Sequence, residues 1–163
     1  MKTHHFSLFV AVLLISTSAF AQSAAQKSFE QLKGLAGSWE GTLDGQTMHV
    51  SLRVTSKGNA LMHEMRGEGP DDPITVFHLD GDRLLLTHYC TAGNQPRMQA
   101  TASPDRKTLA FDFVDATNLA AHANHMQRLV IRVLSRDHHV EEWTFLENGK
   151  ETTDRLDVHR LKS

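Results

Sequence analysis

Short runs in which every second residue is apolar cover most of this chain after residue 37. Between Met48 and Val54, for example, four apolar side chains alternate with three polar ones. This period of two places alternate side chains on opposite faces of a β-strand, whereas an amphipathic helix repeats every three to four residues. The runs cover residues 38–43, 46–54, 59–68, 73–79, 82–90, 96–103, 107–114, 125–134, 138–147 and 150–161. The pattern predicts an all-β domain.

Dipeptides that favour tight hairpin turns separate three pairs of neighbouring runs, at Asp44-Gly45, Asp80-Gly81 and Asn148-Gly149. A two-residue turn at each of them fixes which residues lie opposite one another. The expected pairs include Gly41 with Met48, Phe77 with Leu84, Trp143 with Asp154, and Glu141 with Leu156. The last hairpin also turns polar and charged side chains to the inner face, namely His139, Glu141, Asp154 and Arg160.

About ten hairpin-connected strands predict an antiparallel up-and-down sheet. A sheet of this length has two exposed edges unless it closes on itself, so a barrel is favoured, with a two-sheet sandwich as the alternative. Before the barrel, residues 24–36 predict a short helix, because Phe29, Leu32 and Leu35 share one helical face.

One strand keeps two possible orientations. In residues 125–134, the alternation of apolar residues turns Leu129, Ile131 and Val133 toward the inside of the barrel. A two-residue turn at Arg136-Asp137 would instead turn inward the other set, Arg128, Val130 and Arg132. A shift of one residue reverses the two faces of a strand, so the sequence leaves both orientations open.

The first 21 residues have the layout of a secretory signal peptide. Lys2 supplies positive charge, Phe6–Ile15 is an apolar run, and Ala19 and Ala21 are the small residues before the cleavage site. The run is shorter than the roughly 20 apolar residues that span a membrane, so no membrane insertion is expected after cleavage. We expect a single barrel domain at residues 22–163, exported to the periplasm or secreted.

Charge and cysteine content restrict the partners and the means of stabilisation. The chain has 17 basic and 19 acidic residues, a formal net charge of −2. This balance gives no electrostatic basis for binding nucleic acid, and none is expected as a partner. Cys90 is the only cysteine and cannot form an internal disulfide, so the core must hold the fold together. The oligomeric state is left open.

A short motif opens the first strand of the predicted barrel. Gly37-Ser38-Trp39-Glu40-Gly41 resembles the G-x-W start of lipocalin-like (calycin) barrels and is similar to the opening of nitrobindin-type haem barrels. The chain as a whole resembles a family of small exported bacterial proteins of unknown function, through Phe29–Thr42, Leu84–Met98, Phe111–Phe113 and His125-Met126. The resemblance implies a calycin-like barrel over residues 28–162 and brings no settled activity with it.

The densest group of polar side chains lies between residues 88 and 97, where one predicted strand ends and the next begins. In a barrel this segment lies at one rim, where loops on a rigid scaffold commonly hold ligands. Its amides also suit a wide turn that is bonded to its own backbone. Two inward residues of a distant strand would face the same lumen. The candidate ligand-binding residues are His88, Tyr89, Asn94, Gln95, Arg97, His125, Glu141 and Trp143.

These residues favour an exported, non-catalytic protein that holds a small molecule in its barrel, because barrels of this strand number have room for one small ligand. No catalytic residue is assigned, and no cofactor is expected. A hydrolase or isomerase that uses His88 with Glu141 and Asp154 is an alternative from another class.

A haem-binding barrel is a further alternative. Haem needs an axial His in a dry cavity, and His88, His125 and His139 can each face inward. The ending Asp157–Leu161 differs from the ligand segment that the nitrobindin resemblance implies.

A metal-binding barrel would need several imidazoles close together. The candidates are His122 with His125, and His138 and His139 with His159, of which His138 and His159 are expected to lie opposite each other. Zinc normally takes three or four ligands, which these spacings do not assemble, so no metal site is assigned.

Overall fold

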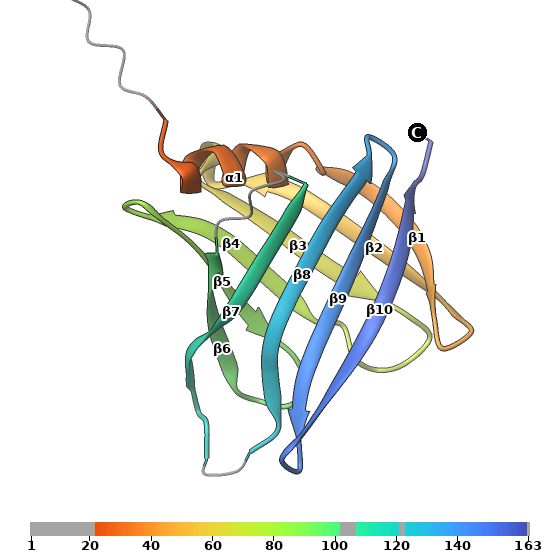
Figure 1. Ribbon diagram of the computed structural model, residues 1–163. Coiled ribbons are helices and arrows are strands. Elements are labelled where there is room, and N and C mark those ends of the chain that lie inside the picture. The colour runs from red at the N-terminus through yellow and green to blue at the C-terminus, as the bar shows by residue number, and fades with distance from the viewer. Residues whose placement is uncertain (1–21, 102–106, 121–122, 163) are drawn as a thin grey trace, which may run out of the picture.

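The computed structural model describes residues 22–101, 107–120 and 123–162, and the predicted signal peptide lies outside these residues. Ten antiparallel strands form one closed barrel, in which each strand pairs with the next in the sequence and the last pairs with the first (Figure 1). In chain order the elements are α1 (Ala24–Lys33), β1 (Gly37–Leu43), β2 (Gln46–Thr55), the 3₁₀ turn η1 (Ser56–Gly58), β3 (Ala60–Arg66), β4 (Ile74–Asp80), β5 (Arg83–Tyr89), β6 (Gln95–Thr101), β7 (Thr108–Thr117), β8 (His125–Ser135), β9 (His138–Glu147) and β10 (Lys150–Arg160). The predicted all-β, up-and-down antiparallel barrel with a short helix before it is confirmed, and the two-sheet sandwich is wrong.

Two of the three predicted hairpins have the expected register. The turn residues of the last hairpin, Asn148 and Gly149, have φ of 50° and 77°, as a two-residue turn that follows the twist of its strands requires. Trp143 lies opposite Asp154, as predicted, and the first hairpin likewise places Gly41 opposite Met48.

The middle hairpin turns one residue later than predicted. Its turn is Gly81-Asp82, and Phe77 therefore lies opposite Leu86 instead of Leu84. Gly81 has a φ of 59° at the first turn position, where glycine is strongly favoured. Because the pairing shifts by an even number of residues, the predicted inward face of both strands is unchanged.

Bulges decide the orientation of β8. The turn pairs Ser135 with His138, as a two-residue turn predicts. A bulge between Val133 and Ser135 then shifts the register, so the rest of β8 has the opposite orientation to the one that this turn alone implies. Leu129 and Ile131 are consequently buried in the barrel. Arg132 lies outside and forms an ion pair with Glu142 at 2.5 Å.

The helix α1 covers one end of the barrel, at the top of Figure 1. Ser23 and Gln26 form a capping box that starts the helix, and Phe29 and Leu32 are buried in the barrel core. The loops that follow β1, β3, β5, β7 and β9 lie at the opposite end, which is the loop end of the barrel. Among the described residues, no helix is long and apolar enough to cross a membrane.

The last hairpin gives a first testable prediction. Replacing Gly149 with Ala is expected to lower the free energy of unfolding by about 1 kcal/mol, because L side chains are disfavoured at positive φ. An added Cβ meets nothing within 4 Å there, so crowding makes no contribution. Chemical denaturation measures the loss. Gly69→Ala, also in open space but without a positive φ, is the control and should remain within about 0.5 kcal/mol of wild type. Equal losses in both variants would contradict the role of the turn.

Candidate functional site

A buried carboxylate lies in the middle of the barrel. Glu141, on β9, is fully buried and accepts hydrogen bonds from three side chains. His63 Nε2 lies 3.1 Å from both of its oxygens, His139 Nε2 lies 2.9 Å from Oε1, and Trp143 Nε1 donates to Oε2 at 3.0 Å. His139, Glu141 and Trp143 are successive inward residues of β9, whereas His63 reaches them from β3 across the barrel.

The donors keep Glu141 ionised. Burial by itself would raise the pKa of Glu141, but attraction to His63 and hydrogen bonds from His139 and His63 outweigh it and hold the pKa well below its usual range. Both carboxylate oxygens are engaged. The carboxylate therefore joins the two imidazoles and the Trp143 indole in one hydrogen-bonded network, in which His139 Nδ1 is buried without a partner among the described residues.

The other inward charges lie apart from Glu141. Arg160 is at the α1 end, where its guanidinium lies 4.1 Å from the centre of the Trp39 ring and donates to the carbonyl oxygen of Ala36 at 2.7 Å. Asp154 is exposed at the opposite end, and partial burial and the charge of Asp44 raise its pKa. The inner face thus carries separate charged groups at different heights.

His88, on β5, is buried toward the loop end. Its Nδ1 lies 2.9 Å from Thr75 Oγ1, and its Nε2 is buried without a hydrogen-bond partner among the residues that the structure describes. Burial, and secondly the charge of His63, lower the pKa of His88 to about 4. The imidazole is therefore neutral at pH 7.

A cavity of about 170 Å³ extends from His88 toward the loop end of the barrel. Its walls are mainly apolar. His88 and Trp143 contribute polar atoms at the inner end of the cavity, and Asp154 contributes a carboxylate at the outer end. The lining residues are Leu43, Met48, Met65, Asp71, Pro73, His88, Cys90, Trp143, Phe145, Asp154 and Leu156. An apolar cavity of roughly 150 Å³ is known to take benzene, so this volume suits a ligand of about one aromatic ring.

The structure brings three of the eight predicted site residues together. His88 and Trp143 line the cavity, with their ring centres 5.5 Å apart, and Glu141 holds the Trp143 indole from behind.

The other five do not line this cavity. Tyr89 and Arg97 lie on the outer face, where Arg97 pairs with Asp115. Tyr89 points outward because β5 has no bulge there and simple alternation holds. Neither side chain lines the cavity, and a role of either in ligand binding stays a prediction.

The amides and His125 bond mainly to backbone groups of the loops. Asn94 is buried and donates to the carbonyl oxygen of Asn124 at 2.8 Å, and its Oδ1 is buried without a partner among the described residues. Gln95 donates to the Gly93 carbonyl oxygen. His125 bonds to the Ala123 carbonyl oxygen at 2.8 Å and packs on Phe113. These side chains therefore hold the loops in place through backbone groups, as in the alternative in which the amides of residues 88–97 stabilise a wide turn.

Sequence reasoning missed two residues of the site, His63 and Thr75. Both follow the inward alternation of their strands, with Leu61 and Met65 flanking His63, and Phe77 following Thr75. Alternation alone therefore identifies both as inward. Alternation does not predict the contacts of these residues, because His63 bonds to a residue 78 positions later in the chain.

The imidazoles expected to serve haem differ in their free nitrogens. His88 lines the cavity and has an unpartnered Nε2 among the described residues. His139 Nε2 is bonded to Glu141, and both nitrogens of His125 have partners. Of the predicted metal candidates, His122 lies outside the described residues.

The predicted hydrolytic group does not assemble around Glu141. That carboxylate bonds to His63, His139 and Trp143, whereas the hydrogen bond of His88 is to Thr75.

Comparisons with known proteins find a similar fold. No protein-family model matches the chain, and no curated protein matches it. The barrel is similar to the crystal structure of Rv2717c from M. tuberculosis, with a TM-score of 0.59 and 15% sequence identity. The match covers 83% of this chain and 98% of that chain. The chain thus shares a barrel architecture with a solved structure.

Proposed function

We propose that this protein binds one small, largely apolar molecule in the cavity at the loop end of its barrel, without catalysing a reaction on it. The observation that carries the proposal is the position of His88. It lines an otherwise mainly apolar cavity, and its buried Nε2 has no partner among the described residues. Buried polar atoms are nearly always hydrogen-bonded in proteins, so a ligand that supplies the missing bond is favoured.

The state of His88 limits the chemistry of the ligand. Its pKa of about 4 means that the ring is uncharged at pH 7 and offers no ion pair to an anion. An apolar cavity also disfavours a charged group, because burying an unpaired charge is very costly. A neutral hydroxyl or carbonyl attached to a ring-sized apolar body therefore suits the site best.

A non-catalytic role agrees with how the polar groups are used. Glu141 is engaged with three donors and is not available as a general base. Asp154, at the mouth, is exposed. Together with the signal-peptide layout of residues 1–21 and the resemblance to small exported proteins, this supports an exported, calycin-like binding protein that acts in the periplasm or outside the cell.

Phenol and toluene, two probes of nearly equal size, test the proposal. Both are expected to bind in the cavity, and only phenol offers a hydroxyl to His88. The ratio of their affinities should fall about fivefold in His88→Leu relative to wild type, since one hydrogen bond contributes about 1 kcal/mol. Comparing ratios cancels the different costs of taking the two probes out of water. Calorimetric titration measures the four dissociation constants.

His78→Leu is the matched control, because His78 lies half-buried on β4 and does not line the cavity. Its ratio should equal that of wild type. Failure of both probes to bind the wild-type protein, or an unchanged ratio in His88→Leu, would overturn the proposal.

A further inference from the structure

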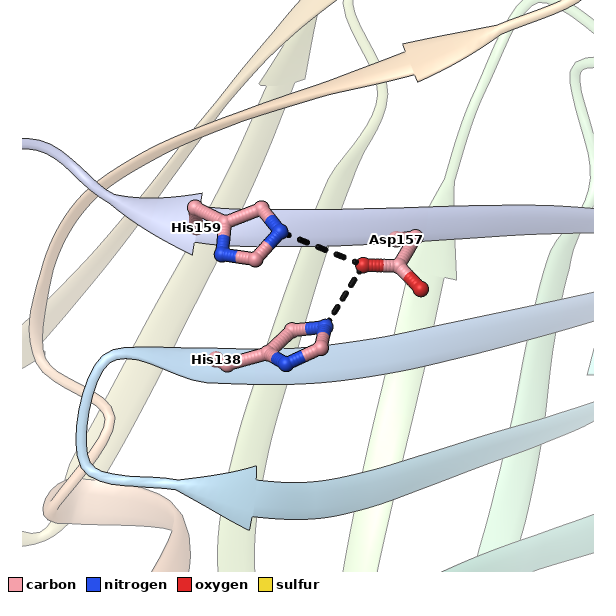
Figure 2. A group of neighbouring side chains, drawn as sticks. All are labelled: His138, Asp157 and His159. Carbon is pink, nitrogen blue, oxygen red and sulfur yellow. Dashed lines mark hydrogen bonds and ion pairs between the residues drawn. The ribbon is translucent and has the colours of Figure 1, made fainter.

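A second cluster of polar side chains lies on the outer wall of the barrel, away from the cavity. His138 comes from the start of β9, and Asp157 and His159 come from β10 (Figure 2). His138 and His159 are direct cross-strand neighbours. The side chains are 29%, 46% and 68% exposed in that order, so solvent reaches all of them.

The two imidazoles are aligned on one oxygen atom. Their rings stack at 4.2 Å with an angle of 21° between the planes. His138 Nε2 lies 2.6 Å and His159 Nε2 lies 3.6 Å from Asp157 Oδ1, as the dashed lines in Figure 2 show. One ligand atom from each of the three residues lies within 4.8 Å of the others.

These separations suit a shared metal ion. Zinc binds imidazole nitrogen and carboxylate oxygen at about 2.0–2.2 Å with tetrahedral geometry. Two ligands on such an ion lie roughly 3.3 Å apart, which is between the two nitrogen–oxygen distances observed here.

The neighbouring groups orient the cluster and add a further carboxylate. Asp157 Oδ2 faces Arg155 Nη2 at 3.6 Å, which leaves Oδ1 to the imidazoles. Glu40, on β1, is the cross-strand neighbour of His159 on its other side. Its carboxylate lies 3.6 Å from His49 on β2. A row of nitrogen and oxygen ligands therefore runs across four neighbouring strands.

We propose that His138, Asp157 and His159 form a binding site for a divalent transition-metal ion, with Zn²⁺ as the ion that their donor set fits. His138 Nε2, His159 Nε2 and Asp157 Oδ1 are the ligands, and water completes the coordination. Two imidazoles and one carboxylate favour zinc or copper over calcium or magnesium, which prefer oxygen ligands. A bound ion joins β9 to β10, directly beside the β1–β10 pairing that closes the barrel.

Titration of the full chain with Zn²⁺ tests the site, with binding measured by calorimetry and the melting temperature recorded with and without the ion. Wild type is expected to bind Zn²⁺ and to melt at a higher temperature when the ion is present, because ligands that bind the folded state stabilise it. Asp157→Asn and His159→Gln should each weaken the affinity at least tenfold and remove most of the rise in melting temperature.

His78→Gln is the control, since it removes a histidine from β4, which is four strands from β10 in the ring. Its affinity should remain within twofold of wild type. Co²⁺ in place of Zn²⁺ adds a spectroscopic test, with an absorption spectrum typical of four-coordinate cobalt expected in wild type and lost in His159→Gln. Absence of binding to wild type, or equal affinities in wild type and both cluster variants, would overturn the proposal, because any ion bound would then lie elsewhere.

Discussion

Replacing Glu141 with Leu is expected to lower the free energy of unfolding by about 3–5 kcal/mol, because the buried N–H groups of His63, His139 and Trp143 would lose their shared acceptor. His63 and His139 are at most 1% exposed, so solvent does not replace the carboxylate as their acceptor. Urea denaturation followed by far-ultraviolet circular dichroism measures the loss. Glu141→Gln, which keeps the shape and one acceptor oxygen, should show an intermediate loss.

Glu142→Leu is the matched control for this prediction. Glu142 is the next residue on β9, faces outward, and forms ion pairs with Arg132 and Arg155. Partly exposed pairs of this kind contribute little, so the expected loss is about 1 kcal/mol or less. If the Glu141 and Glu142 variants lost stability equally, the central network would not be a main support of the barrel.

Lowering the pH from 7 to 4 is expected to remove about 3 kcal/mol of stability through His88. Burial and the charge of His63 lower the pKa of His88 from 6.5 to about 4 in the folded protein. In the unfolded chain His88 takes up a proton as the pH falls through about 6.5, whereas the folded protein resists protonation until about pH 4. The unfolded state is therefore favoured progressively across this window, by about 1.4 kcal/mol for each pKa unit.

The variant His88→Met isolates this contribution. Urea denaturation at pH 7, 5 and 4 should show that the variant loses about 3 kcal/mol less than wild type between the two extremes. At pH 7 its stability should be close to that of wild type, because removing a buried nitrogen without a partner offsets the lost hydrogen bond to Thr75. His78→Met is expected to keep the wild-type pH dependence. Identical pH profiles for wild type and His88→Met would contradict the burial of a neutral imidazole.

The fold was predictable because its determinants are local. Alternation located every strand to within about three residues, and the turns at Gly45 and Gly149 fixed two registers through dipeptides that favour positive φ. One register was wrong, and one strand orientation was left open. The bulge near Val133 and the later turn at Gly81 depend on how neighbouring strands twist and close, which a single strand does not reveal.

The site was less predictable because its contacts cross the barrel. Alternation turned His88, Glu141 and Trp143 inward correctly. The partner of Glu141 that lies on the opposite wall, His63, depends on the order and tilt of strands far apart in the sequence. The contacts of the rim residues were equally hard to predict. Asn94 donates to a backbone oxygen 30 residues later in the chain, whereas Gln95 donates to that of Gly93.

The position of Arg160 has a consequence for the order of folding. Its guanidinium donates to the carbonyl oxygens of Ala36 and Gly34, which precede it by 124 and 126 residues. The segment that joins α1 to β1 thus obtains these hydrogen bonds only from the last strand of the chain. β1 also has a free edge until β10 pairs with it. Closure of the ring therefore needs the C-terminal strand, and we expect the docking of β10 to be a slow, long-range step of folding.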